Sequence, residues 1–308
     1  MSRRKRRDED APASLFLIDK PEGPTSHDIV QLVRRWTGVR RVGHGGTLDP
    51  LATGLLPVFM GGATRLIEYL TEHPKTYTAR VRLGQATDTD DSEGTVIAEH
   101  PVPTFTLAAI EEALLPFHGE VEQLPPVYSA IKVDGVTAHR AARRGKPVER
   151  PTRIVQIHEL TLDAWDTPHI ELRMTVGSGT YVRAIARDLG EALGCGAHVV
   201  AMRRTAIGPV SADDAQTPDA LQAAAEQNGE IWSLAASPRI FLEHWPRVVV
   251  NDDQRRTLLH GQAIWAAAHA EPFMLALARD GELVAVLARD PETSGRWQPV
   301  KVLAKTMH

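Results

Sequence analysis

The residues TYTARVRLG, at positions 76–84, alternate between two kinds of side chain. The odd-numbered positions from Tyr77 to Leu83 are aromatic or aliphatic, whereas the even-numbered positions from Thr76 to Arg82 are threonine and arginine. This period of two predicts a β-strand with one buried face. Residues 169–176 alternate in the same way and predict a second strand, and the apolar residues 14–19 predict a third.

Helical patterns lie between these strands. Thr25 or Ser26 can cap a helix that ends at Gly38, and residues 180–193 are amphipathic and are followed by Gly194. Further helices are expected near 63–71 and 106–116. Strands and helices do not follow a regular βαβ alternation, so the pattern predicts an α+β fold rather than a doubly wound sheet.

The rest of the chain suggests how the domains are organised. Glycine and proline punctuate residues 42–57, which we expect to be a loop, and residues 212–238 have the composition of a connecting segment. After residue 238, short strand-like runs separated by turn signals predict a small β-rich domain over 239–308. Residues 1–12 are highly charged and are expected to form a disordered tail, which leaves a main domain over 13–238.

Charge is distributed unevenly along the chain. The net charge is only −4, but seven basic residues between Lys132 and Arg153 face only Asp134 and Glu149. Clustered positive charge is typical of phosphate binding, so residues 123–153 are a candidate RNA-binding insertion. The alternative is an ordinary solvated face.

Other compositional features exclude several classes of protein. The chain has one cysteine, no apolar run long enough for a membrane span and no signal peptide at its start, so we expect a cytoplasmic protein. No P-loop motif and no zinc-ligand spacing occur, and we expect neither a metal nor a cofactor. The acidic run that begins at Asp88 lacks the glycine that a calcium loop needs at its sixth position.

The most unusual stretch is GHGGTLDPLATG, at residues 43–54. Its glycines allow tight turns, and Pro50 keeps Asp49 out of the helical region of backbone space. A rigid loop that presents Asp49 beside His44 suits an active site. The same residues also suit a simple connecting turn, and physical reasoning alone does not decide between the two interpretations.

This stretch resembles the catalytic motif of the TruB family, the bacterial tRNA pseudouridine-55 synthases. Four further blocks resemble this family in the same order, and together they cover roughly residues 14–210. These blocks are KTY at 75–77 with RLG at 82–84 and TDTD at 87–90, PVYSAIK at 126–132, GTYVR at 179–183 with DLG at 188–190, and RRT at 203–205 with GP at 208–209. The resemblance implies a pseudouridine synthase fold, with a mixed, mainly antiparallel central sheet flanked by helices and a PUA-like domain at the C-terminus.

The resemblance also implies roles for individual residues. Asp49 matches the catalytic aspartate, Arg183 the arginine that pairs with it, and Tyr77 the tyrosine that stacks on the extruded uracil. Arg183 would then keep Asp49 ionised by lowering its pKa. The residues matched to substrate binding are His44, which enters the T-arm, Tyr181 and Met202, which line the uracil pocket, and Lys20.

Each of these residues has a structural alternative. Tyr77 begins a buried strand face, Tyr181 could pack at a helix start, and His44 could be an ordinary loop histidine. Two residues depart from the family pattern: Gly45 replaces a common threonine, which could loosen the loop, and Met202 replaces a common leucine.

Three functions are therefore compared. The first is a stand-alone, cofactor-free enzyme that isomerises uridine 55 in the T-arm of transfer RNA and acts as a monomer. The second is a non-enzymatic RNA-binding or RNA-folding protein, and the third is a synthase that depends on a guide RNA. The joint presence of Asp49, Tyr77 and Arg183 favours an enzyme, and the basic insertion favours the stand-alone form. The resemblance does not distinguish attack of Asp49 on the uracil ring from attack on the sugar.

Overall fold

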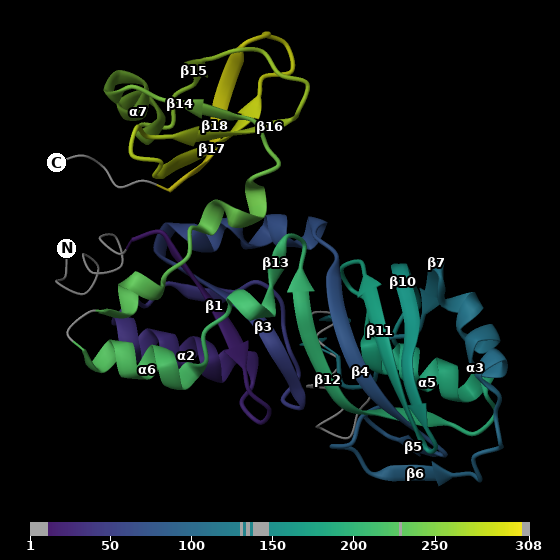
Figure 1. Ribbon diagram of the computed structural model, residues 1–308. Helices are drawn as coiled ribbons and strands as arrows, with labels where there is room; N and C mark the ends of the chain where they lie inside the picture. The colour runs from purple at the N-terminus through teal and green to yellow at the C-terminus, as the bar shows by residue number, and fades with distance from the viewer. Residues whose placement is uncertain (1–11, 130–131, 134–135, 138–147, 228–229, 304–308) are drawn as a thin grey trace. The chain divides into compact units, whose positions relative to one another are not determined.

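The computed structural model describes residues 12–129, 132–133, 136–137, 148–227 and 230–303. The predicted disordered tail lies almost wholly outside these residues, as does much of the basic insertion. The chain divides into two compact units, and each is described by itself (Figure 1). Unit 1 comprises the described residues of 1–49, 55–70 and 209–308, and unit 2 comprises 50–54 and 71–208.

Unit 2 is built on a sheet of long strands, in the order β12-β4-β11-β10-β7, in which all neighbours are antiparallel. Helix α5 contacts β12 and β4, and helix α3 contacts β10 and α5, so these two helices cover one face (Figure 1). The elements are β4 (Lys75–Leu83), β5 (Gln85–Thr87), β6 (Val96–Glu99), α3 (Leu107–Leu114), η2 (Leu115–Phe117), β7 (Gly119–Gln123), β8 (Lys132–Val133), β9 (Val136–Thr137), β10 (Arg153–Asp166), β11 (His169–Val176), α5 (Val182–Ala192) and β12 (Ala197–Ile207).

The alternation predicted for β4 is confirmed in this sheet. Ala79, Val81 and Leu83 are at most 1% exposed, whereas Arg80 on the opposite face is exposed and pairs with Glu171 of β11. Strand β11 shows the same pattern, because its apolar residues from Ile170 to Val176 are also buried. The alternating side chains therefore set which face of the sheet the helices cover.

Unit 1 contains the N-terminal elements and the C-terminal β-rich part. Helix α2 begins after Thr25, which caps it with its side chain, and ends at Gly38 in the left-handed conformation, as predicted. The elements are β1 (Ser14–Lys20), α2 (Ser26–Thr37), β2 (Val42–His44), η1 (Gly61–Glu72), β13 (Val210–Ser211), η3 (Ala212–Asp214), α6 (Pro218–Glu226), η4 (Glu230–Leu234), η5 (Pro238–Leu242), β14 (Arg247–Val249), α7 (Asp252–Leu259), β15 (Ile264–Trp265), β16 (Phe273–Leu277), β17 (Leu283–Arg289) and β18 (Arg296–Val302).

Strand β3 (Ala52–Met60) contributes to both units. Its first residues pair in parallel with β12, with Met202 opposite Ala52, and its later residues pair with β1 and β2. This parallel pairing within an otherwise mainly antiparallel sheet makes the sheet mixed.

The C-terminal part is a small β-rich domain, as predicted. Its five strands follow the order β14-β16-β17-β18-β15, and Trp297 lies fully buried in their core with Val284, Leu287 and Leu258 of helix α7. Glu68 of η1 pairs with Lys301 of β18 at 3.0 Å.

Three sequence expectations were wrong in detail. Residues 42–57 are not a continuous loop, because β2 and β3 pair on either side of residues 45–51. The helix expected near 63–71 is a 3₁₀ helix over Gly61–Glu72. The segment 212–238 contains helix α6. Thr217 caps the start of this helix with its side chain, and Pro218 is its first residue.

None of the described helices combines the length and apolar character that a membrane crossing needs.

Candidate active site

Asp49 lies in the loop that follows β2, and the residue before it is held firmly. The buried hydroxyl of Ser26, at the start of helix α2, accepts a hydrogen bond from the Leu48 N–H at 2.7 Å and donates one to the Leu48 carbonyl at 2.9 Å. Both backbone polar groups of Leu48 are thereby satisfied inside the protein. The result is a half-buried Asp49 on a loop whose backbone is anchored one residue earlier.

Gly45 explains why the loop tolerates little bulk. Its N–H donates to the Pro57 carbonyl at 2.8 Å, and a Cβ at this position would lie 2.3 Å from a methyl group of Leu70. Packing is therefore tight at the position where we expected the missing threonine to loosen the loop. His44, the last residue of β2, lies opposite Val58 of β3 and is half-buried.

Lys20 is fully buried at the end of β1. Its ammonium group donates to the carbonyls of Pro21 and Pro24, each at 2.8 Å. These contacts fix the turn that leads into helix α2, and the first residue of this helix is Ser26. Lys20 thus supports the Asp49 loop through the backbone that carries its serine anchor.

In unit 2, Tyr77 lies on β4 beside a buried arginine. Tyr77 is opposite Arg204 of β12, and the guanidinium Nη1 of Arg204 lies 3.5 Å from the tyrosine hydroxyl. Arg204 is 1% exposed, and Met202, two residues earlier on the same strand, is 7% exposed. An apolar side chain, an aromatic ring and a cation therefore occupy adjacent positions of one sheet.

Glycine allows the strand that carries Arg204 to pair closely with β3. Gly54 has a φ of +97°, and a Cβ there would lie 2.2 Å from the Arg204 carbonyl oxygen. Any side chain at residue 54 would push the two strands apart. Gly54 thus sets the position of Arg204.

Arg183 is held by an ion pair that the sequence did not identify. It lies in the first turn of α5 and pairs with Asp91 at 3.1 Å, and the two side chains are 4% and 5% exposed. Its Nη1 also donates to the Thr89 carbonyl at 2.7 Å and its Nη2 to the Tyr128 carbonyl at 2.9 Å. A cation near a helix N-terminus is slightly unfavourable, so a carboxylate such as Asp91 accounts for its stable burial.

Tyr181 caps the same helix and is fixed through its backbone. The side-chain amide of buried Gln123 accepts from the Tyr181 N–H at 2.8 Å and donates to its carbonyl at 3.1 Å. The guanidinium of Arg153 lies 5.8 Å from the centre of the Tyr181 ring, within cation–π range. The ring is half-buried, and its orientation is set by residues at the ends of β7 and β10.

A buried lysine ties the start of β4 to the segment that enters α5. Lys75 donates to the His73 carbonyl and to the Ser178 hydroxyl, both at 2.6 Å, and Ser178 donates in turn to the Thr71 carbonyl at 2.6 Å. Burial lowers the pKa of Lys75 to about 8, and the positive charge of Arg204 acts in the same direction. This chain of bonds links the strand of Tyr77 to the loop before Arg183.

The residues predicted for the site therefore fall into two sets, each within one unit. Lys20, His44 and Asp49 belong to unit 1, and the other four belong to unit 2. Sequence reasoning missed the anchoring roles of four residues: Ser26, Asp91, Gln123 and Arg204. All four lay inside stretches that the sequence had singled out, Ser26 as a helix cap, Asp91 in the acidic run, Gln123 at the start of the basic insertion and Arg204 in the RRT block.

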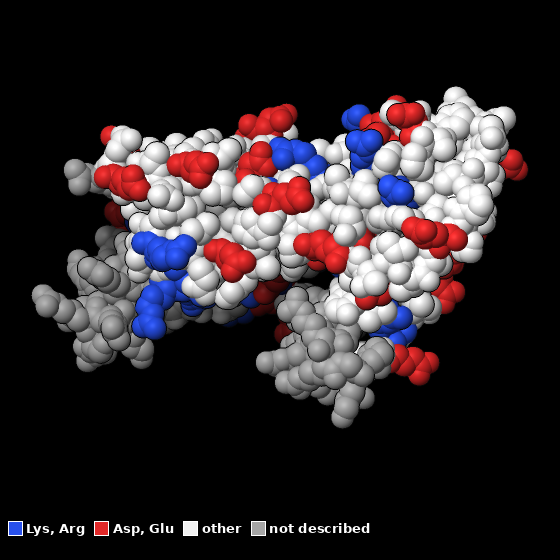
Figure 2. All heavy atoms as spheres, turned by 90° about the horizontal axis from the view of Figure 1, so that it is seen from below, with Lys and Arg blue, Asp and Glu red and all other residues white. Residues whose placement is uncertain are grey.

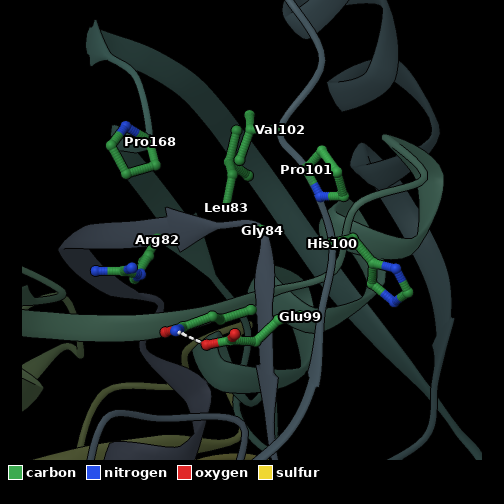
Figure 3. Close-up of a pocket in the computed structure, with 9 residues that line it drawn as sticks. Arg82, Leu83, Gly84, Glu99, His100, Pro101, Val102 and Pro168 are labelled. Carbon is green, nitrogen blue, oxygen red and sulfur yellow. Dashed lines mark hydrogen bonds between the residues drawn. The ribbon is translucent and has the colours of Figure 1, made fainter.

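Other surface features do not coincide with these residues. A hollow of about 370 Å³ is lined by Arg82, His100, Val102 and Pro168, among others, and Gln85 donates a hydrogen bond to Glu99, both of which also line it (Figure 3). None of the predicted site residues lines this hollow. Among the described residues, no group of three or more histidine, cysteine or acidic side chains could hold a metal ion.

Charge is mixed on one face of the protein as well as in the sequence. On the face shown in Figure 2, acidic and basic side chains are interspersed. On this face the mixed charges agree with the small net charge of the chain.

The comparisons with known proteins agree on one family. Residues 34–182 match the family model described as TruB family pseudouridylate synthase (N terminal domain). Residues 183–235 match the tRNA pseudouridylate synthase B C-terminal domain. A tRNA pseudouridine synthase B of Azoarcus sp. (strain BH72) is 44% identical over 252 residues, which cover 81% of this chain and 82% of the relative. A second, from Thermobifida fusca (strain YX), is 42% identical over 298 residues, covering 94% of this chain and 98% of the relative.

Solved structures share the fold. The crystal structure of a Cbf5-Nop10-Gar1 complex contains a chain similar to this one with a TM-score of 0.71 and 24% identity, covering 98% of this chain and 88% of the other. A chain in the structure of an H/ACA RNP bound to a substrate RNA containing 2′-deoxyuridine also gives a TM-score of 0.71, at 23% identity, covering 96% of this chain and 89% of the other. At these identities the likeness shows the fold alone. It confirms the predicted α+β architecture, with a mixed sheet and a small β-rich domain.

Proposed function

Because the chain belongs to the TruB family of pseudouridylate synthases and is a tRNA pseudouridine synthase, an isomerase, we propose that it acts on uridine 55 in the T-arm of transfer RNA with Asp49 as its nucleophile. The relatives are named as tRNA pseudouridine synthase B, which supports transfer RNA as the substrate. The position of the uridine and the role of Asp49 are the parts that this proposal adds.

The observation that carries the proposal is the way in which Asp49 is presented. Its carboxylate stands on a glycine-containing loop, and the preceding residue is anchored on both its N–H and its carbonyl by the buried Ser26 hydroxyl. A nucleophile works best when its approach to the substrate is fixed before binding. A merely connecting turn has no need of a buried anchor immediately before one acidic residue.

The reaction that this carboxylate would serve is an isomerisation without net oxidation or reduction. The bond between N1 of uracil and C1′ of ribose breaks, and a bond between C5 and C1′ forms. The hydrogen on C5 leaves as a proton, and N1 gains one. Because atoms and electrons balance within the nucleoside and the solvent, we propose a cofactor-free enzyme.

The side chains of unit 2 supply the remaining groups. Tyr77 would stack on the extruded uracil and take part in proton movement, while Met202 and the Tyr181 ring would line the apolar part of the pocket. Arg183 would pair with Asp49 to keep its charge. The guanidinium of Arg204 lies 3.5 Å from the Tyr77 hydroxyl, a contact that would help to fix the tyrosine where it stacks on the uracil.

Recognition of the RNA is proposed to come from the chain itself. His44 would enter the T-arm, Lys20 would support the substrate-binding loop, and the basic insertion over 123–153 would grip the RNA backbone. Residues 239–308 would form a PUA-like RNA-binding domain with local contacts, because its nine basic and eight acidic residues nearly balance. We therefore propose a stand-alone monomer that needs no guide RNA.

Tritium release from C5-labelled uridine in a transfer RNA transcript tests the proposal. The wild-type protein alone should release tritium, and a transcript with cytidine at position 55 should release none. Asp49→Asn should abolish release while RNA binding stays within about a few-fold, since the substitution keeps the shape of the side chain and removes only its charge.

The alternatives give different results in the same assay. Undiminished release by Asp49→Asn would refute the nucleophile. A wild-type protein that binds and refolds transfer RNA without any release would point to the non-enzymatic function. Release that appears only when a second RNA is added would point to a guided enzyme.

A further inference from the structure

Helix α5 carries two arginines that face the same acidic turn. Arg183 and Arg187 are four residues apart, so they lie one above the other on one helix face. Arg183 pairs with Asp91, and Arg187 pairs with the neighbouring Asp90, each at 3.1 Å. The Arg187 guanidinium also donates to Asp188 from its Nε at 2.8 Å, which fixes its plane.

Both arginines also bind the segment that leaves β7. Arg183 donates to the Tyr128 carbonyl at 2.9 Å, and Arg187 donates to the Leu124 carbonyl at 2.8 Å. Each guanidinium therefore joins three elements: helix α5, the 88–91 turn and the start of the basic insertion.

The returning end of the insertion reaches the same place. Arg150 donates to the Pro125 carbonyl at 2.9 Å, next to the carbonyl that Arg187 binds. Burial lowers the pKa of Arg150, and the charges of Arg187 and Asp90 both act on this group. Strand pairing also brings the residues that flank this segment together, because Arg153 of β10 lies opposite Gln123 of β7. The two ends of the segment 124–152 are thus held together, next to the carbonyl of Leu124 that Arg187 binds.

Asp90 combines an unusual backbone conformation with a largely buried carboxylate. Asp90 has a φ of +62°, and it is the one residue other than glycine with a positive φ among those the structure describes. A glycine would adopt this conformation with less strain, although aspartate tolerates it better than most residues. Burial raises the pKa of Asp90, and the charges of Arg187 and Arg183 oppose that rise. The ion pair with Arg187 thus stabilises an aspartate at a position where the positive φ alone would favour glycine.

We propose that Arg187 and Asp90 are positioning residues that hold the start of segment 124–152, at Leu124, against the turn that holds Arg183, and that the docking of RNA, rather than the chemical step, depends on this pair. The inference rests on the proposed function of Arg183 and of the insertion. Neither Arg187 nor Asp90 touches the reacting nucleoside in this account. Their effect passes through the carbonyl of Leu124 on one side and through Asp91, the next residue in the chain, on the other.

The planar guanidinium is the feature that this positioning requires. It donates in three directions from fixed positions, whereas a lysine ammonium is a compact charge on a flexible stem. Arg187→Lys should therefore behave like Arg187→Gln, although it keeps the charge. A role in general attraction of RNA would make the lysine variant behave like the wild type.

Steady-state tritium release from transfer RNA tests the inference with Arg187→Lys, Arg187→Gln, Asp90→Asn and the double variant Asp90→Asn/Arg187→Gln. We expect KM for transfer RNA to rise about tenfold in each, with kcat within about threefold of the wild type, because docking rather than the chemical step depends on the pair. The double variant should be no worse than the worse single variant, because both remove one interaction. Arg173→Gln, which breaks an exposed ion pair with Asp163 in the same unit, is the matched control for charge and should leave KM unchanged.

Three results would overturn the inference: a wild-type KM for Arg187→Lys, a kcat that falls while KM stays constant, or an equal rise in KM for Arg173→Gln. Amide hydrogen exchange of the free protein gives a readout that does not depend on activity. Residues 119–129 should exchange faster in Arg187→Gln and at the wild-type rate in Arg173→Gln. Failure of the wild-type enzyme to release tritium would refute the proposed function, whereas unchanged exchange in Arg187→Gln would refute the positioning role alone.

Discussion

The loop that carries Asp49 and the helix start that carries Arg183 are fixed by different physical means. The Asp49 loop is anchored by uncharged hydrogen bonds from Ser26 to Leu48 and by close packing around Gly45. The Arg183 turn is anchored by buried charge, through the Asp91 carboxylate and the backbone carbonyls of Thr89 and Tyr128. The bonds from Ser26 to Leu48 position the loop through its backbone and make no use of the charge of the Asp49 carboxylate. A buried cation needs a permanent counter-charge as well.

The largest effect on stability should come from removing the counter-charge of Arg183, which is the carboxylate of Asp91. Asp91→Asn keeps the shape of the side chain but leaves the Arg183 guanidinium, which is 4% exposed, without its carboxylate at 3.1 Å. Breaking a buried pair in this way should lower the free energy of unfolding by about 3 kcal/mol or more. Urea denaturation monitored by circular dichroism measures this loss.

The exposed pair between Arg173 and Asp163 provides the control for Asp91→Asn. Its side chains are 57% and 33% exposed, so solvent screens the interaction. Asp163→Asn should therefore cost less than about 1 kcal/mol. Equal losses for the two variants would mean that burial of the Arg183 pair does not determine its strength.

The second largest effect concerns Lys75, which ties β4 to the segment before Arg183 through Ser178. Its pKa in the folded protein is about 8, while the unfolded chain has the ordinary value of 10.5. Between pH 8 and 10.5 the unfolded state binds more protons than the folded state, so stability contributed by this group rises with pH. Below pH 8 the full cost of burying the charge is present.

Comparison with Lys75→Met isolates this contribution from the other groups that titrate at alkaline pH. The free energy of unfolding of the wild type relative to the variant should increase between pH 8 and 10.5, by at most about 3 kcal/mol. Urea denaturation at several pH values measures the difference. A difference that is constant over this range would mean that Lys75 is not desolvated in the folded state.

The two regions also differ in how far the sequence predicted them. The strands of unit 2 could be predicted because side-chain alternation reports burial directly, as residues 76–84 show. Helix α2 could be predicted because Thr25 and Gly38 have local conformational preferences that mark its ends. The α+β class follows from such local signals, and the sheet type followed only from the family resemblance.

The contacts that fix the site could not be predicted in this way. Ser26 and Leu48 are 22 residues apart, and Asp91 and Arg183 are much farther apart, so their pairing depends on the tertiary fold. Strand β3 was taken for loop because its glycine and proline residues suggested turns, although Gly54 is needed where β3 and β12 pair closely. Local patterns thus identified which residues carry chemistry, but not which residues hold them in place.

The smallest effect on stability, and the most informative about the loop, should come from the neutral anchor. Ser26→Ala leaves the N–H and the carbonyl of buried Leu48 without the serine hydroxyl, which should cost about 2 kcal/mol of unfolding free energy. Because Leu48 precedes Asp49, the carboxylate should lose its fixed approach, and kcat for tritium release should fall about tenfold or more.

The adjacent residue separates this effect from simple weakening of helix α2. The Thr25 side chain accepts from the Asp28 N–H and caps the helix without touching Leu48, so Thr25→Ala should cost about 1 kcal/mol. Its kcat should stay at the wild-type value, because helix stability alone does not orient the nucleophile. If the two variants lowered kcat equally, the serine would serve only the helix. If Ser26→Ala alone lowered it, the neutral anchor would be part of how this loop presents its carboxylate.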